Sequence, residues 1–197
     1  AQTIANNPDV TWETTTEKNI GVDLTLFKNS FSVSIDAYNR YTNNILTSVP
    51  VSATFGLPPA IVNAGAMSNK GIETELGYSK KSGQFLYDIS VNASYNKNNV
   101  EKYAGVDVYE VASEGDAVVR KKGVPWNSYY GYEWIGYFQS DAEATSSAVQ
   151  SPLVGAGDLK FKDQNGDGVI DGKDRIILGN PVPSFTYWFN LTFRYKG

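Results

Sequence analysis

The sequence predicts an all-β protein whose antiparallel strands form part of a large transmembrane β-barrel with a long extracellular loop excursion. The evidence is a strict alternation of apolar and polar residues, the length of the alternating segments, and the unequal lengths of their connections. The alternation is clearest over residues 185–195. The large apolar residues there are Phe185, Tyr187, Phe189, Leu191, Phe193 and Tyr195. Because successive side chains of a strand point to opposite faces, one face meets an apolar medium and the other meets something polar.

The length of this segment indicates which medium the apolar face meets. It covers eleven residues, and a tilted strand needs about 9–11 residues to cross a bilayer. Strands in water-soluble sheets are commonly ~5–6 residues long. Outer-membrane barrels repeat such segments with apolar side chains outward and polar side chains inward. We therefore expect lipid on the apolar face.

The same alternation recurs in four segments upstream, at residues 19–27, 31–41, 71–78 and 85–95. Tyrosines near the strand ends suit a membrane interface. These are Tyr41, Tyr78, Tyr95, Tyr187 and Tyr195. A β-sandwich with one buried face would alternate similarly. The alternative is therefore a calcium-stabilised extracellular β-sandwich module that binds glycans or mediates adhesion.

Composition excludes several classes of function. No apolar stretch reaches the ~18 residues of a membrane-spanning helix. The chain has no cysteine and no histidine, so it lacks disulfides, thiolate metal sites and the usual catalytic base. The net charge is -4, and the basic cluster at residues 120–122 is short, whereas nucleic-acid binding needs a broader basic surface. We expect neither an enzyme nor a nucleic-acid-binding protein.

The connections are short on one side and long on the other, as in barrels with periplasmic turns and extracellular loops. Residues 28–30 and 80–84 form the tight turns. We expect barrel strands in 1–95 with a long extracellular loop at 46–69, an extracellular region at 96–184, and a further barrel strand at 185–197.

Local structure is also expected inside the region 96–184. A crossing strand at 129–138 would leave 139–184 as an unusually long periplasmic connection, so we expect 129–138 to be extracellular β-structure. Ser140 followed by Glu143 is typical of a capping box, which predicts a short helix over 141–149.

The most specific chemical motif lies at residues 163–174, which match the calcium-loop pattern D-x-[DN]-x-[DN]-G-x5-E with Asp in the last position. The candidate ligands are Asp163, Asn165, Asp167, the carbonyl of Val169, Asp171 through water, and Asp174. Gly168 permits the sharp turn, and four carboxylates this close repel one another without a cation. We expect Ca²⁺, with Mg²⁺ as the alternative, to hold the loop with a Kd of ~10⁻⁴–10⁻³ M. A polar turn without metal stays open.

Aromatic residues crowd the region 96–184, and flat rings suit sugar rings. The candidate substrate-binding residues are Trp126, Tyr129, Tyr130, Tyr132 and Trp134. Alternatively, they pack the loop core or contact a lid. Charged residues on the polar strand faces could contact cargo or pair across strands. These are Asp23, Asp36, Arg40, Glu73, Glu75, Asp88 and Arg194.

Several short motifs carry a family resemblance over nearly the whole chain. They are NPDVTWE at 7–13, NIGVD at 19–23, NKGIE at 69–73, YGY at 130–132, GDLKFKDQNGDG at 157–168, GNP at 179–181 and YKG at 195–197. In this order they resemble the SusC/RagA group of TonB-dependent outer-membrane transporters of the Bacteroidetes. The resemblance implies a plugged 22-stranded barrel in the outer membrane, a SusD-like surface lipoprotein partner, energy from TonB, and import of oligosaccharides or peptides.

The resemblance also implies that the chain is one part of a larger assembly. Five crossing strands cannot close, because the smallest such barrels have about 8 strands, and open sheet edges do not survive in lipid. We expect a longer polypeptide or another chain to supply the remainder of the barrel, the plug and the segment that contacts TonB.

Overall fold

The structure is a computed structural model that describes residues 7–48, 61–103, 108–113 and 116–196. The chain divides into two compact units. The first contains residues 1–108, 121–126 and 182–197, and the second contains residues 109–120 and 127–181.

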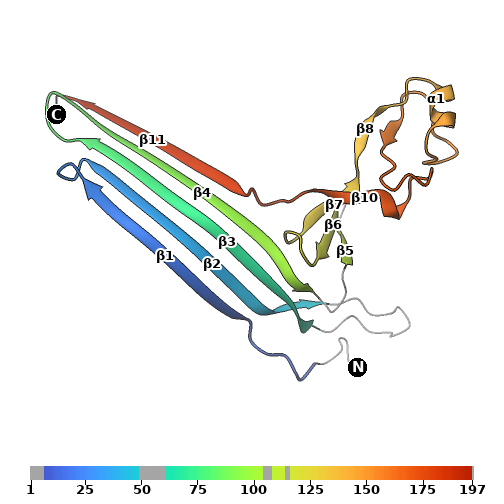
Figure 1. The fold of residues 1–197 in the computed structure, drawn as a ribbon, viewed down its shortest axis with the longest axis horizontal. Helices are drawn as coiled ribbons and strands as arrows, with labels where there is room; N and C mark the ends of the chain where they lie inside the picture. The colour runs from blue at the N-terminus through green and yellow to red at the C-terminus, as the bar shows by residue number, and fades with distance from the viewer. Residues whose placement is uncertain (1–6, 49–60, 104–107, 114–115, 197) are drawn as a thin grey trace. The chain divides into compact units, whose positions relative to one another are not determined.

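The first unit is one antiparallel sheet of five strands in the order β1-β2-β3-β4-β11 (Figure 1). The strands are β1 (Thr14–Leu26), β2 (Phe31–Ser48), β3 (Ile61–Lys80), β4 (Phe85–Tyr103) and β11 (Phe185–Tyr195). The bounds of β11 match the expected segment, and the other four strands contain the expected segments nearly whole. Only β4 and β11 are neighbours that lie far apart in sequence.

The pairing register places all five apolar sets on the same side of the sheet. One continuous row is Ile20, Ala37, Ile72, Tyr95 and Phe185, in which each residue is the direct partner of the next. Because side chains alternate along each strand, alignment of one row aligns the others. We call this side the apolar face and the opposite side the polar face.

The two ends of the sheet differ. The turns at 27–30 and 81–84 define what we call the turn end, and the connections at 49–60 and 104–184 leave from the opposite loop end. The first turn holds Phe27, Lys28 and Asn29 in succession in the left-handed region, with φ of 54°, 56° and 63°. The amide of Ser30 closes it by donating to the carbonyls of Leu26 and Phe27, each at 3.2 Å.

Four strands extend further toward the loop end than the alternation predicts. β1 begins at Thr14, β2 continues to Ser48, β3 begins at Ile61 and β4 continues to Tyr103. The expected loop at 46–69 is therefore wrong at both ends, and its centre, 49–60, lies outside the described residues. Residues 96–103 are likewise strand rather than loop. Alternation fails to reveal these extensions because large apolar residues there, such as Leu46, Val100 and Tyr103, do not recur at every second position, while backbone pairing continues regardless.

The buried core of this unit lies in these extensions rather than behind the apolar face. Val100 and Tyr103 are almost fully buried. Residues 121–126 run beside β4, where Val100 donates to the carbonyl of Val124 at 2.9 Å and its own carbonyl accepts from Gly123 at 2.8 Å. The Trp126 ring packs edge-on against Tyr103 at a centroid distance of 5.5 Å. The segment thus covers β4 beyond the end of β11.

The second unit consists of short elements. A four-stranded sheet has the order β10-β7-β6-β5, and β8 pairs with β9. The elements are β5 (Val108–Ser113), β6 (Asp116–Lys121), β7 (Ser128–Tyr132), β8 (Trp134–Tyr137), α1 (Asp141–Ser146), β9 (Leu159–Phe161), the 3₁₀ turn η2 (Gly172–Asp174) and β10 (Arg175–Gly179). The expected β-structure at 129–138 is confirmed as β7 and β8. In the described part of the chain, no helix is long and apolar enough to cross a membrane.

Helix α1 begins as expected and ends early. The Ser140 hydroxyl accepts from the Glu143 amide at 3.2 Å, and the Glu143 carboxylate accepts from the Gln139 amide at 2.8 Å, one residue before the expected capping-box partner. The helix stops at Ser146 rather than at 149. Val149 is held in a parallel bridge with Val169 through two 2.9 Å backbone hydrogen bonds, so it cannot continue the helix.

Candidate functional site

The polar face of the five-stranded sheet contains a concavity of about 450 Å³. Its lining includes Asp36, Glu73, Glu75, Asn92 and Trp188. Asp36 lies directly opposite Glu73, and Glu75 lies opposite Asn92, which in turn lies opposite Trp188. The register of four strands therefore gathers these side chains on one surface.

The concavity is acidic. Among the described residues, none of its three carboxylates forms an ion pair with Lys or Arg. The buried carboxamide oxygen of Asn92 adds an acceptor without a hydrogen-bond partner within the described ranges. An acidic surface of this kind repels anions and attracts cationic or neutral hydrogen-bonding ligands.

Other charged residues of the polar face form pairs across strands. Cross-strand pairing was one of the two expectations for these residues, the other being contact with cargo. Arg40 Nε lies 3.0 Å from Glu17 Oε2 on the opposite position of β1. The Ser79 hydroxyl donates to Asp88 at 2.6 Å across β3 and β4. These groups therefore stabilise the register rather than stand free for a ligand.

The five aromatic candidates are divided between the two units. Trp126 belongs to the first unit, where it packs on Tyr103. Tyr129, Tyr130 and Tyr132 lie on β7 of the second unit, where alternation turns Tyr129 away from the other two.

Tyr132 is packed inside the second unit. Its ring lies 5.5 Å from the Phe161 ring, and the Arg175 guanidinium lies 5.4 Å from its centroid on the adjacent strand β10. These contacts favour the interpretation that Tyr132 packs the loop region.

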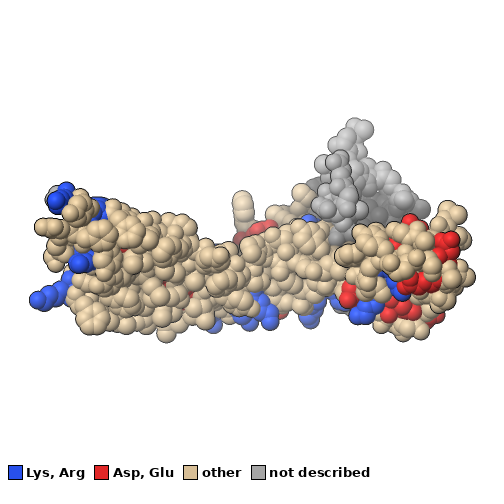
Figure 2. Space-filling model, turned by 90° about the horizontal axis from the view of Figure 1, so that it is seen from above, with Lys and Arg blue, Asp and Glu red and all other residues tan. Residues whose placement is uncertain are grey.

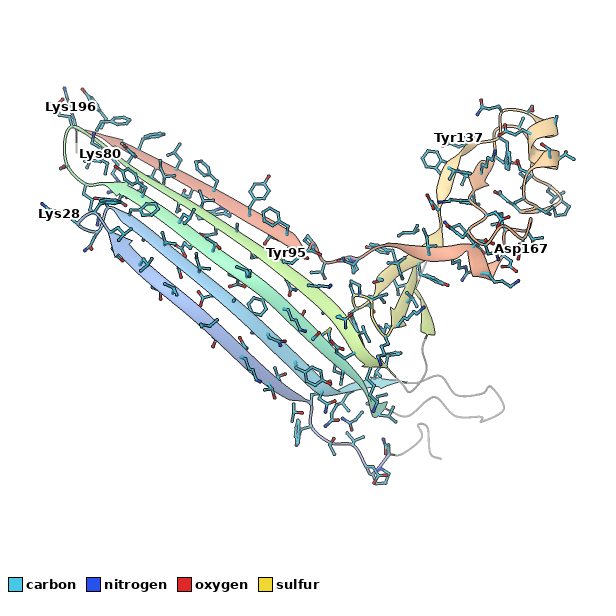
Figure 3. All side chains as sticks on the ribbon, viewed as in Figure 1. Lys28, Lys80, Tyr95, Tyr137, Asp167 and Lys196 are labelled. Atoms are coloured by element: carbon cyan, nitrogen blue, oxygen red, sulfur yellow. The ribbon has the colours of Figure 1, made fainter. Side chains whose placement is uncertain are left out.

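Trp134 is the most exposed of the five candidates. It is 55% exposed and forms a T-shaped pair with Tyr137, itself 51% exposed, at a centroid distance of 5.4 Å. The Trp134 indole N–H donates to the Gly136 carbonyl at 2.6 Å, and this hydrogen bond fixes the Trp134 ring. Its partner Tyr137 is labelled in Figure 3. Tyr137 is one of the aromatic residues that crowd this region of the sequence but was not one of the five assigned to substrate, although the spacing of two aromatic residues around a glycine could have indicated the pair.

The loop at 163–174 is held by hydrogen bonds that backbone amides donate to side-chain oxygens. The two oxygens of Asp163 accept from Gly166 at 2.7 Å and Gly168 at 2.8 Å. Both glycines have positive φ, 75° and 83°, a conformation that glycine adopts without a steric cost. Asn165 accepts from the Asp167 amide at 2.9 Å, and Asp167 accepts from the Val169 amide at 3.0 Å.

The end of the loop closes on Asp174, which is fully buried. Its oxygens accept from the Gln164 amide at 2.9 Å and the Asp171 amide at 2.8 Å, while the Asp171 side chain accepts from the Lys173 amide at 2.8 Å. The Asp171 hydrogen bond holds the pKa of the Asp174 carboxyl below its usual range. The Val169 amide does the same for the pKa of Asp167.

The six candidate ligands thus share one turn, in which side-chain oxygens of Asp163, Asp167 and Asp174 accept from backbone amides. Within the described ranges, no three His, Cys, Asp or Glu side chains are grouped so that they could hold a metal ion. The Lys173 ammonium lies 3.5 Å from Asp167 and 3.6 Å from Asp171, and supplies a positive charge beside them. Calcium binding stays a prediction.

The apolar face defines the class of protein. A β-sandwich would cover its apolar rows with a second sheet. Instead, Phe185, Phe189 and Phe193 are 58%, 56% and 56% exposed, so that alternative is wrong. The long antiparallel strands, the two-faced register and the tight turns at one end are the wall of a transmembrane β-barrel, seen here as an open part of the sheet.

Comparison with known proteins identifies the family. A family model described as "TonB dependent receptor-like, beta-barrel" matches residues 1–196, and the chain belongs to this family. It is 32% identical over 197 residues to TonB-dependent receptor P3 of Formosa agariphila, covering 96% of the chain and 20% of the relative. It is 27% identical over 205 residues to TonB-dependent receptor SusC of Bacteroides thetaiotaomicron, covering 98% and 19%. The chain therefore spans about a fifth of the length of these curated relatives.

Solved structures show the same fold. The RagAB peptide transporter matches with a TM-score of 0.79 at 24% identity, over 98% of this chain and 20% of that chain. The RagAB peptide importer in its closed-closed state matches with a TM-score of 0.77 at 25% identity, over 100% and 21%. The expected resemblance to the SusC/RagA group is confirmed.

Proposed function

We propose that this chain is part of the wall of a TonB-dependent outer-membrane importer. The observation that carries the proposal is the register, which turns every apolar set to one side of a sheet whose other side is acidic and polar. A barrel of this kind presents the apolar face to lipid and the polar face to a lumen or plug. The chemistry is transport rather than catalysis.

The height of the apolar face supports a membrane position. Residues 185–195 of β11 span ten steps of ~3.4 Å, which is roughly 34 Å along the strand. A strand tilted by ~45° would then cross about 24 Å. The apolar band of outer-membrane barrels is ~25 Å tall.

The cargo and partners are proposed from relatives and from the loop end. Two similar structures are described as a peptide transporter or importer, and SusC is a similar sequence. We assign oligosaccharides or peptides as cargo, energy from TonB through the remainder of the protein, and a SusD-like lipoprotein above the loop end. The open Trp134–Tyr137 pair is the contact that we assign to cargo or lipoprotein. The acidic concavity disfavours anionic cargo.

Site-directed labelling tests the membrane position. This chain has no native cysteine. In the full-length protein, any accessible cysteine elsewhere is first replaced, and single cysteines are then introduced at chosen positions of this chain. We expect Leu153→Cys, at a 90% exposed side chain in the long connection, to react with an impermeant maleimide in intact cells. Ser82→Cys in a tight turn should react only after the outer membrane is permeabilised. Equal labelling of both in intact cells would contradict the proposal.

Uptake measurements test transport. Cells that lack the full-length gene should fail to accumulate a labelled oligosaccharide or peptide that complemented cells accumulate, and a proton uncoupler should abolish the difference. Substitution of both Glu73 and Glu75 by Gln should alter uptake of cationic peptides more than that of neutral oligosaccharides. The same change at Glu13, outside the concavity, serves as the control. Identical uptake with and without the gene would refute an importer.

We also propose that the loop at 163–174 binds Ca²⁺ and is stabilised by it. The ligand spacing and the tight turn through Gly168 support this, and Lys173 competes for the same oxygens. Addition of Ca²⁺ at millimolar concentration should slow proteolysis of the loop. Asp163→Ala with Asp167→Ala should remove the effect, whereas Asp158→Ala, just outside the motif, should retain it. No calcium effect on the parent would end the proposal.

A further inference from the structure

A row of lysines crosses the apolar face at its boundary toward the loop end. Lys18 on β1 pairs with Asn39 on β2, Asn39 pairs with Lys70 on β3, and Lys70 pairs with Lys97 on β4. All three lysines are exposed. We call Lys18, Lys70 and Lys97 the lysine row.

The lysine row stands directly beyond the last apolar row. Two residues further along each strand toward the turn end come Ile20, Ala37, Ile72 and Tyr95, on the same face. The residues on the other side, toward the loop end, include Thr16, Tyr41, Ser68 and Asn99, which are hydroxyl- or amide-bearing. The apolar face therefore ends at the lysine row, where the hydrocarbon of a membrane would give way to headgroups.

The charges of the lysine row are not balanced by the protein. Like charges placed directly opposite on neighbouring strands destabilise a sheet, and Lys70 and Lys97 occupy such positions. Among the described residues, no lysine of the row forms an ion pair. The facing acidic group is Glu101, whose carboxylate accepts from the Ser68 hydroxyl at 2.6 Å. Three positive charges against one negative charge leave an excess that an external anion would neutralise.

The surface at the row is also hollowed. A concavity of about 370 Å³ is lined by Lys18, Lys70, Ser68, Tyr41 and Glu101, among others. It offers the ammonium groups of Lys18 and Lys70 and the hydroxyl groups of Thr16 and Tyr41 as donors, while the Ser68 hydroxyl already donates to Glu101. Such a set suits an anion with several acceptor oxygens, of which phosphate is the most common in membranes.

The turn end provides a contrast. Lys28, Lys80 and Lys196 lie there (Figure 3), and Figure 2 shows basic side chains gathered at this end of the sheet. Lys80 lies over the Tyr87 ring at 5.8 Å and Lys196 over the Tyr195 ring at 5.3 Å. These ammonium groups therefore already contact aromatic faces, and no two of the three are direct cross-strand partners.

We propose that the lysine row binds the phosphate groups of a lipid headgroup in the outer leaflet, with the acyl chains lying along the apolar rows that begin at Ile72 and Tyr95. The proposal rests on the membrane position given under the proposed function. A lipid complements both parts of the surface, because its phosphates bind the lysines while its acyl chains cover the adjoining apolar rows. A free phosphate would satisfy only the first.

Lipid binding by the purified full-length protein in detergent tests the proposal. The probe is diphosphoryl lipid A, with its enzymatically dephosphorylated form and inorganic phosphate alongside, and the measurement is retained lipid by native mass spectrometry. The test variant carries Lys18→Gln, Lys70→Gln and Lys97→Gln, and the matched control carries Lys28→Gln, Lys80→Gln and Lys196→Gln. We expect the test variant to bind lipid A at least about tenfold more weakly, while the control stays within about twofold of the parent.

The outcomes separate the two proposals. Equal lipid A binding by test variant and control, equal binding of the dephosphorylated form, or displacement by inorganic phosphate at the same concentration would overturn the lipid site. All three lipid-binding outcomes can be measured on protein that still fractionates with the outer membrane and remains heat-modifiable on gels. Loss of outer-membrane fractionation by the parent would instead refute the proposed function.

Discussion

Tyr38 lies over Gly71, its direct partner on the neighbouring strand, and its ring occupies the space where a side chain at Gly71 would stand. A Cβ added to Gly71 would be 2.6 Å from both Cζ and Oη of Tyr38, and 2.5 Å from the carbonyl oxygen of Tyr95. The ring covers the strand backbone that glycine leaves bare. The glycine of the NKGIE motif is therefore required for close approach across three strands.

This contact predicts the effect of Gly71→Ala in the full-length protein. The substitution should lower the free energy of unfolding by about 1–3 kcal/mol, because a backbone carbonyl and a packed ring both obstruct the new methyl group. The measurement is the denaturant midpoint of the folded barrel, followed by heat-modifiability on gels.

Gly77→Ala is the matched control on the same strand and face. The added Cβ there meets the Ser32 hydroxyl at 2.5 Å and no backbone atom, and a hydroxyl can rotate away. We expect this variant to stay close to the parent. An equal loss at both glycines would contradict the role assigned to Tyr38.

The position of Phe189 in the middle of the apolar face predicts a strong response to charge. Phe189→Arg should destabilise the assembled barrel by about 2–4 kcal/mol if the position lies at the bilayer midplane. Asn190→Arg, the next residue on the polar face, should cost far less because its side chain points away from lipid. Urea titration of both proteins in lipid vesicles measures the difference, and equal stabilities would argue against lipid at Phe189.

The alternation of apolar residues predicted the five strands because one physical cause, lipid on one side, acts on every second residue. It could not predict where β3 begins. Near that end of the strand, Ala64, Ala66 and Ser68 are buried against other segments of the protein rather than against lipid. Small side chains of this kind give no periodic apolar signal. The partner of β4 was equally hidden, because β11 follows after a connection of many residues with its own structure.

For a related reason, the sequence predicted the local parts of the candidate site but not the parts that depend on strand pairing. Local spacing predicted the turn at 163–174, whose internal hydrogen bonds between side chains and backbone amides join residues at most ten positions apart. The acidic concavity depends on the register of four strands, which sets Asp36 beside Glu73, and sequence alone places neither residue against the other. Trp126 and Trp134 are near in sequence, yet they lie in different units, which sequence proximity does not reveal.

The loop at 163–174 should lose stability in acid. Hydrogen bonds hold the pKa values of Asp167 and Asp174 below the usual range, so the folded loop binds protons less readily than the unfolded loop. Its stabilisation is then fully present above the ordinary Asp pKa of about 3.9 and is lost as the pH falls through the lower folded values. The protection factors of the loop amides against hydrogen exchange should fall below about pH 4, while those of β3 remain high. An equal fall in both regions would point to global unfolding instead.

Asp174→Asn should open the same loop at neutral pH. The buried carboxylate accepts from two amides through its two oxygens, and an amide group presents only one oxygen, so one backbone N–H would face another donor. Asp171→Asn is the matched control, because the Asp171 side chain accepts one backbone amide through one oxygen and asparagine retains that acceptor. Limited proteolysis of the full-length proteins should show cleavage within 163–174 that is roughly tenfold faster for Asp174→Asn and nearly unchanged for Asp171→Asn. Comparable cleavage of the two variants would mean that charge near Lys173, rather than the paired amides, holds the turn closed.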